Sequence, residues 1–303
     1  MERYNEISRK ITLPFGDIEI YSRDGELYKD LLGEGRYETF FAKDRYRVYI
    51  GWDCFEEDLT YRGSQMKKGV YLGHNIGTPC KFHMSDNDIY IYAENEVTYR
   101  KVFWSFIVKY IFTKACLEHG ILHLKATILR ADRDKGLILV LGKGGSGKTT
   151  LADSLCKHGF QILSNTHCML RDNYVWGINS WIRRREDKNE KYTIDTSKVF
   201  ELEGNVKKII IVEGNKNKER IVIEEMNEIE KYYYIKNFSA AISNYDLKEE
   251  VFDYMTKNKK EAVYLLKRED DLVKKMAYKK IYNVELDSLN EKLVKSLAIF
   301  LQH

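Results

Sequence analysis

Residues 141–150 read LGKGGSGKTT and carry two overlapping patterns that bind phosphate groups. The glycines of the pattern G-x-G-x-x-G, which is typical of dinucleotide-binding loops, are Gly142, Gly144 and Gly147. The same stretch also fits G-x-x-x-x-G-K-[ST], in which Lys148 and Thr149 follow the last glycine. This second pattern is typical of loops that bind a nucleoside triphosphate. The residue types therefore indicate a phosphate-binding loop, and its ligand is either a dinucleotide or a nucleoside triphosphate.

The residues around the loop favour the triphosphate. A dinucleotide loop needs an acidic residue about 20 positions beyond its glycines to bind the ribose, and residues 161–170, QILSNTHCML, contain no carboxylate. In the triphosphate pattern Lys148 contacts the β and γ phosphates, and the Thr149 hydroxyl ligates Mg²⁺, which prefers oxygen. Backbone N–H groups at the positive end of the following helix bind phosphate oxygens. We therefore predict ATP and Mg²⁺ as cofactors, with Thr149 on the metal. The residues expected to hold them are Gly142, Lys143, Gly144, Gly145, Ser146, Gly147, Lys148, Thr149 and Thr150.

Hydrophobic periodicity predicts the elements that position this loop. The apolar run at 137–141 predicts a buried strand, and a helix over 149–158 ends at Gly159, a typical C-terminal cap. The order strand, glycine loop, helix is the context that the triphosphate pattern requires. The other elements expected beside the loop are a helix over 98–119 and strands over 121–130 and 160–164.

The chain divides into a strand-rich region and a mixed region. Residues 1–97 contain several short alternating or β-branched runs separated by turn residues, which predict a β-rich N-terminal region. Residues 98–303 carry the loop and end in charged helical patterns near 247–256, 269–280 and 286–301. We therefore expect an α/β protein in which a β-rich N-terminal region precedes a nucleotide-binding domain with a helical C-terminus.

Charge and cysteine content argue against two classes of function. The net charge of +4 is small beside 96 charged side chains, 50 basic plus 46 acidic, so charge gives no reason to expect nucleic-acid binding. The five cysteines are widely spaced and form no C-x-x-C pair, which argues against a zinc site.

Two segments bear on the location of the chain. The opening residues MERYNEISRK lack a hydrophobic signal region. Lys109 and Lys114 interrupt the apolar stretch 101–120, which therefore predicts a core-packed helix and no membrane span. We expect a cytoplasmic protein that binds neither nucleic acid nor membrane, and we leave open whether it forms a homo-oligomer.

Motifs on both sides of the loop resemble a known family. Leu122-His123 opens the strand before the loop, Gly159-Phe160 ends the helix, and the next strand ends in Leu-Ser-Asn at 163–165. This combination is similar to the core of the HPr kinase/phosphorylase and PEP carboxykinase-like ATPases, and a looser similarity extends over 120–225. The resemblance implies a PEP-carboxykinase-like (HPr-kinase-like) P-loop nucleotide domain. It also implies ATP- and Mg²⁺-dependent transfer of the γ-phosphate to a Ser or Thr hydroxyl of a peptide or protein.

The resemblance narrows the acceptor in one respect. Family members that act on HPr carry a further glycine- and arginine-rich signature, and this sequence does not contain it. The wider family suggests a dedicated peptide acceptor instead, such as the precursor of a modified natural product.

The site residues implied by the resemblance include one departure. In the family, an acid on the strand after the P-loop helix helps to hold the metal and takes the proton from the acceptor hydroxyl, whereas this chain has Asn165 and Thr166 there. His167, on the same face as Asn165 if the strand continues, is a candidate substitute base, and a packed structural histidine is the alternative. His123 matches the family histidine near the transferred phosphate, and a core position is its alternative.

Two further groups have competing interpretations. Arg183 and Arg185 are candidates to bind the substrate because guanidinium groups suit phosphate oxygens, but the run RRREDKNEK also fits a solvated loop. Glu213 ends an apolar strand, as a metal-binding carboxylate would, and a structural role is its alternative. The predicted catalytic residues are thus His123, Lys148, Asn165 and His167. The missing acid keeps open a second function, a nucleotide-binding regulatory or scaffold protein that transfers no phosphate.

Overall fold

The structure is a computed structural model of the 303-residue chain. It describes residues 9–22, 36–51, 65–67, 70–73, 80–93, 111–131, 136–143, 145–165, 167–179, 182–186, 189–193, 202–214, 219–239, 259–287 and 289–303. Gly144, Thr166 and the helix predicted near 247–256 lie outside these residues. The chain forms two compact units that alternate along the sequence. The first comprises Met1–Glu34, Thr39–His119 and Ile242–Lys267, and the second comprises Gly35–Glu38, Gly120–Ala241 and Arg268–His303.

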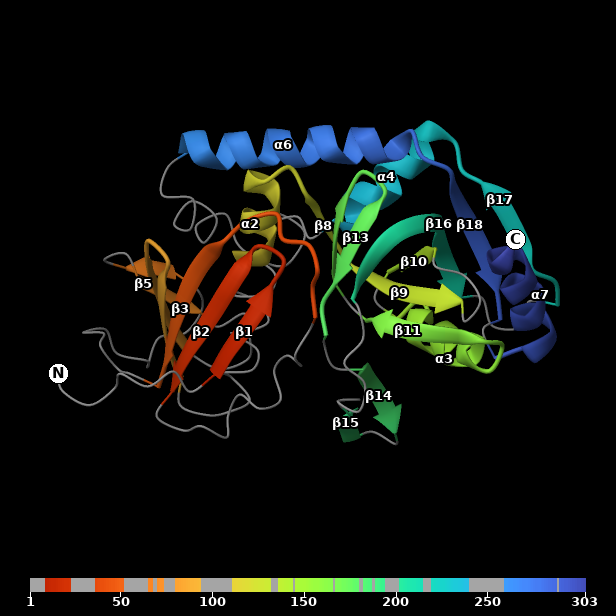
Figure 1. Cartoon of the computed structure of the whole chain (residues 1–303), viewed down its shortest axis with the longest axis horizontal. Coiled ribbons are helices and arrows are strands. Elements are labelled where there is room, and N and C mark those ends of the chain that lie inside the picture. Colours follow the sequence, from red (N-terminus) through yellow and green to blue (C-terminus); the bar gives the residue numbers. More distant parts are fainter. Residues whose placement is uncertain are drawn as a thin grey trace. The chain divides into compact units, whose positions relative to one another are not determined.

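A seven-stranded sheet forms the first unit (Figure 1). In spatial order its strands are β1 (Arg9–Leu13), β2 (Gly16–Ser22), β3 (Asp44–Ile50), β7 (Asp88–Ala93), β6 (Cys80–Ser85), β5 (Val70–Gly73) and β4 (Gln65–Lys67). Alternating Ile and Val side chains of β2, β3 and β7 are buried on one face. On the other face Tyr21, Tyr49 and Tyr90 lie in register and stack, with 4.9 Å between neighbouring ring centroids. The strands predicted in this region are present, and the unit also contains the helix α2 (Phe112–Glu118).

A nine-stranded sheet forms the second unit. In spatial order its main path is β11 (Phe160–Ser164), β9 (Ala126–Ala131), β10 (Leu137–Leu141), β16 (Glu203–Gly214), β13 (Tyr174–Gly177), β12 (Cys168–Arg171) and β8 (Leu122–Leu124). The strands β18 (Ile281–Leu286) and β17 (Val222–Glu225) extend it from β16. Its helices are α3 (Lys148–Cys156), α4 (Glu228–Phe238), the C-terminal part of α6 (Lys259–Ala277) and α7 (Glu291–Gln302).

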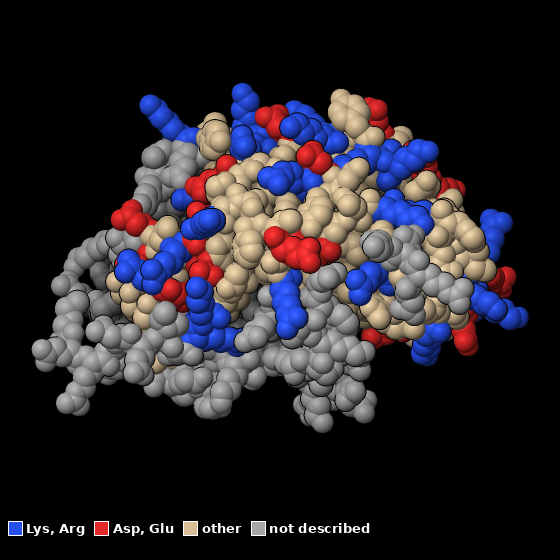
Figure 2. All heavy atoms as spheres, viewed as in Figure 1, with Lys and Arg blue, Asp and Glu red and all other residues tan. Residues whose placement is uncertain are grey.

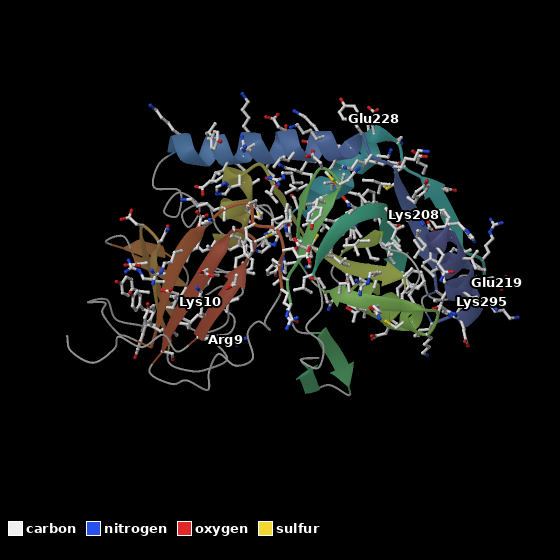
Figure 3. All side chains as sticks on the ribbon, viewed as in Figure 1. Arg9, Lys10, Lys208, Glu219, Glu228 and Lys295 are labelled. Carbon is white, nitrogen blue, oxygen red and sulfur yellow. The ribbon has the colours of Figure 1, made fainter. Side chains whose placement is uncertain are left out.

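The central strand β10 is buried on both faces because each face carries its own hydrophobic layer. Its odd-numbered leucines belong to a cluster that includes side chains of α4 and α6. Ile138 and Val140 belong to a second cluster that includes side chains of α3 and α7. On that second face Lys208 of β16, labelled in Figure 3, donates a hydrogen bond to the Phe300 carbonyl and lies 4.3 Å from the centroid of the Phe300 ring. The strand that feeds the glycine loop is therefore fixed from both sides.

Several elements differ from the sequence-based expectation. The strand expected over 121–130 is broken at Lys125 into β8 and β9, because the Lys125 N–H bonds to the carbonyl of Phe238 at the end of α4. The strand β18 and the helix α4 were not predicted. The last helix begins at Glu291 and not near residue 286, because the Asn290 side chain caps it and the preceding residues belong to β18.

The surface and the helices give two further observations. In Figure 2, Lys and Arg side chains are interspersed with Asp and Glu side chains over the face in view, as a small net charge among many charged residues would give. Among the described residues, no helix is long and apolar enough to cross a membrane.

We predict that the layer against β10 dominates the stability of the second unit. Leu139 is fully buried, so Leu139→Ala should lower the free energy of unfolding by about 2–5 kcal/mol. Leu289 is 74% exposed, and Leu289→Ala should change the free energy of unfolding by less than about 0.5 kcal/mol. Urea unfolding followed by circular dichroism measures both values. Equal decreases in the free energy of unfolding of the two variants would contradict the described core.

Candidate phosphate-binding site

The glycine loop connects β10 to α3 at the carboxyl edge of two parallel strands. Leu141, the last residue of β10, pairs with Ile211 of β16, which runs on to Gly214. Gly142, Gly145 and Gly147 have φ angles of 157°, 80° and 85°, a region that favours glycine. Ligands of α/β proteins bind at this edge of the sheet. The strand and the helix predicted on the two sides of the glycine loop are therefore confirmed with nearly the predicted bounds.

The loop is pressed against the end of β16. A Cβ atom added to Gly142 would lie 2.5 Å from the Ser146 Oγ and 2.9 Å from the Val212 carbonyl oxygen. A Cβ atom added to Gly214 would lie 2.6 Å from the Ser146 carbonyl oxygen. Only glycine fits at these two positions, so the end of β16 packs directly against the loop. Sequence reasoning missed Gly214, although a glycine directly after an apolar strand was the available signal.

Lys148 is folded over the loop. Its Nζ donates hydrogen bonds to the carbonyl oxygens of Gly142 and Lys143, both at 2.7 Å. Burial lowers the pKa of Lys148 to about 8, and the nearby charge of Lys125 is the second cause. The ammonium group is thus held at the mouth of the loop in an environment that disfavours its charge, and an anion there would reverse that preference.

Two further observations test whether these residues fit a phosphate chain. The Ser146 Oγ is buried and has no hydrogen-bond partner among the described residues. The first N–H groups of α3 have no acceptors within the helix, as at any helix start, and the residue before the helix is Gly147, which brings no side chain over them. The loop therefore combines a hydroxyl donor, a positive helix end and an ammonium group, which fits phosphate.

The metal has fewer candidate ligands. Within the described ranges, no group of three or more His, Cys, Asp or Glu side chains is arranged to hold an ion. Thr149 lies in the first turn of α3 and is half-buried. A Mg²⁺ ion there would therefore be held by the Thr149 hydroxyl, phosphate oxygens and water, which is a usual set of ligands for this ion.

Asn165 follows β11 and lies at the same edge as the loop. Its Oδ1 accepts a hydrogen bond of 2.9 Å from the Thr127 hydroxyl, and its exposed fraction is 5%. Thr127 pairs with Val140, one residue before the end of β10. The position at which the family resemblance implies an acid is therefore occupied by a buried amide, which neither takes a proton nor carries negative charge.

His123 and His167 form a buried pair. The β8–β12 pairing sets His123 beside Met169, and the His167 Nδ1 lies 3.0 Å from the His123 Nε2. Burial lowers the pKa of His123 to about 3, so this ring is neutral at physiological pH. One ring donates and the other accepts in this contact. The Ser164 hydroxyl donates to the His167 carbonyl and fixes the backbone that carries the pair.

The remaining candidates are two arginines and Glu213. Arg183 and Arg185 belong to β14 (Ile182–Glu186), which pairs with β15 (Asn189–Thr193) in a separate two-stranded sheet, and their side chains lie outside the described residues. Glu213 accepts a hydrogen bond of 2.6 Å from the Tyr234 hydroxyl of α4, which raises the pKa of Tyr234 to about 12. The structure thus gives Glu213 a partner on α4, the alternative structural role.

Comparison with known proteins gives little support of its own. No protein-family model matches the sequence, and no curated protein matches it. Among solved structures, the Hpr(Ser) kinase/phosphatase from Coxiella burnetii aligns with 60% of this chain and 99% of its own, at a TM-score of 0.30 and 13% sequence identity. A similarity at this level assigns neither fold nor activity, so the function must be argued from the residues of the site.

We predict that Lys148 titrates far below an ordinary lysine. Burial and Lys125 disfavour its charge, so its amine should become half neutral near pH 8 in the ligand-free protein. The rate of Lys148 acetylation as a function of pH, measured by peptide mass spectrometry, reports this midpoint. The reference is N-acetyl-lysine amide, with a pKa of about 10.4. A Lys148 midpoint equal to that of the reference would contradict the buried geometry.

Proposed function

We propose that the chain binds ATP with Mg²⁺ at residues 142–150 and transfers the γ-phosphate to a hydroxyl group. The observation that carries the proposal is the loop itself, which combines the Lys148 ammonium held over the loop, the start of α3 and the close contact of Gly142 and Ser146 with the end of β16. The sequence resemblance supports Ser or Thr of a peptide or protein as the acceptor. Arg183 and Arg185 remain candidates to bind that acceptor.

The proposed transfer uses residues at the carboxyl edge of the sheet. Lys148 moves from the two carbonyl oxygens to the β and γ phosphates. The Thr149 hydroxyl would hold Mg²⁺, which would offset the charge of the phosphate oxygens. The acceptor oxygen bonds to the γ-phosphorus as the bond from that phosphorus to the β-bridging oxygen breaks, and ADP leaves. His167 takes the proton of the acceptor hydroxyl, and His123 orients its ring through the 3.0 Å contact. The histidine pair thus supplies the base that Asn165 does not.

A second function is favoured by one specific observation. The Asn165 Oδ1 is already engaged by the Thr127 hydroxyl, and both groups are neutral. A site that binds nucleotide without an acid at this position suits a regulatory or scaffold protein that holds ATP and transfers no phosphate. The two functions share the ligand and differ in turnover.

We predict that ATP binding depends on Lys148. Isothermal titration with ATP, ADP, GTP and NAD should show that the wild type binds ATP in the presence of Mg²⁺. Lys148→Ala should lower the affinity for ATP by about tenfold or more, because a charge-assisted contact is lost. The control is Lys157→Ala, which removes a lysine from the other end of α3. Undiminished ATP binding in Lys148→Ala would remove the loop from the proposal, and tight NAD binding by the wild type would favour the dinucleotide pattern.

The pH dependence of ATP affinity follows from the same lysine. Because bound phosphates favour the ammonium form, the pKa of Lys148 should be higher in the complex than its value of about 8 in the free protein. ATP affinity should therefore be full below about pH 8 and fall by up to about tenfold per pH unit above it. Lys148→Ala should lose this dependence. A wild-type affinity that stays constant through this range would contradict the assignment.

We predict that transfer requires His167. With γ-labelled ATP and candidate peptides, the wild type should add one phosphate to Ser or Thr, detected by mass spectrometry. His167→Gln should lower turnover by about 10²–10⁴ without changing ATP affinity, because it removes only the base. His158→Gln, at the end of α3, is the control. Full turnover in His167→Gln would eliminate this base. A phosphorylated small molecule would replace the peptide acceptor, and ATP binding without transfer to any acceptor would favour the regulatory function.

A further inference from the structure

Lys125 lies at the break between β8 and β9, beside the glycine loop. Its N–H donates to the Phe238 carbonyl at 2.8 Å, and its neighbour Leu124 forms a β-bridge with Ser239, so the backbone is held at the end of α4. The next residue, Ala126, pairs with Leu141, the last residue of β10. In an antiparallel pair the register continues outward, which sets Lys125 opposite the first loop residue, Gly142.

Lys125 and Lys148 therefore approach the same end of the loop from different elements. Lys148 reaches it from α3, since its Nζ donates to the Gly142 carbonyl oxygen. Lys125 directly precedes β9, the strand that carries Thr127, the partner of Asn165. Two cations held together repel each other, and an anion between them removes that repulsion.

The position of Lys125 also indicates which phosphate group its ammonium would contact. The start of α3 and the loop amides hold the α and β phosphates, and the P-loop lysine extends to the γ-phosphate. Lys125 directly precedes Ala126, which pairs with Leu141, and Gly142 directly follows Leu141, so the Lys125 backbone lies at the β10 end of the loop. At this edge the chain has a lysine and an amide, Asn165, where the family resemblance implies an acid.

We propose that Lys125 is a second phosphate-binding cation, which contacts the terminal phosphate of the bound nucleoside triphosphate and offsets charge there together with Lys148. This inference rests on the proposed function, because it requires a nucleotide in the loop. A contact between Lys125 and the terminal phosphate would give the site a higher affinity for ATP than for ADP. The preference would come from one side chain outside the glycine-loop pattern.

The test compares ATP and ADP binding in Lys125→Met, Lys125→Arg and Lys157→Met by isothermal titration with Mg²⁺. Lys125→Met should lower the affinity for ATP by about tenfold or more. It should lower the affinity for ADP by clearly less, because only ATP has the terminal phosphate. Lys125→Arg keeps the charge and should retain the preference for ATP. Lys157→Met removes one cation from the far end of α3 and should change neither affinity.

The outcomes separate this inference from the function on which it rests. Wild-type ATP binding with an unchanged ATP affinity in Lys125→Met would overturn the role of Lys125 and leave the proposed function standing. Equal weakening of ATP and ADP in Lys125→Met would also overturn it, because the contact would then not be with the terminal phosphate. A wild type that binds neither nucleotide would overturn the proposed function and this inference together. If Lys125→Met does not fold, Lys125→Gln and Lys125→Arg give the same comparison.

Discussion

The site depends on the close contact between the glycine loop and the end of β16. Gly142 and Gly214 have no space for a Cβ atom because the Ser146 backbone and side chain and the Val212 carbonyl lie against them. This contact requires β10 and β16 to be adjacent, parallel and level at their carboxyl ends, which the pairing of Leu141 with Ile211 provides. The hydrophobic layers on both faces of β10 hold that register, and α3 then starts with its N–H groups at the edge of the sheet.

The polar side chains assigned to the site are neutral or basic, whereas the carboxylate of Glu213, at the end of β16, accepts a hydrogen bond from the Tyr234 hydroxyl of α4. Lys148 and Lys125 bring positive charge, Asn165 and Thr127 bond to each other, and the buried His123–His167 contact involves a neutral ring. Such a site is matched to an anion and is poorly matched to a bare cation, since the described residues offer no acidic cluster for a metal. Mg²⁺ would therefore enter with the triphosphate, through the phosphate oxygens and Thr149. In the proposed transfer His167 takes the proton of the acceptor hydroxyl, so a variant at this position distinguishes transfer from nucleotide binding alone.

The sequence predicted the elements whose signals are local, and it failed where long-range contacts decide. The run at 137–141, the loop glycines and Gly159 each carry their own information, so β10, the loop and α3 were placed almost to the residue. The strand β18 is six residues long and lies between helices, and its pairing with β16 and β17, which are distant in the sequence, makes it a strand. The break at Lys125 depends on the Phe238 carbonyl, more than 100 positions away, so the sequence carried no signal for the position of Lys125. The partner of Glu213, Tyr234, lies on a helix that periodicity did not reveal.

The central claim is that the loop is a nucleotide site whose lysine exchanges backbone carbonyls for phosphate. A crystal structure of the chain with Mg²⁺ and a non-hydrolysable ATP analogue tests it most directly. The account predicts the triphosphate along residues 142–150, with the Lys148 Nζ released from the carbonyl oxygens of Gly142 and Lys143 and bonded to β- and γ-phosphate oxygens. Crystals grown at saturating analogue in which Lys148 keeps both carbonyl bonds, with the nucleotide bound elsewhere, would contradict it.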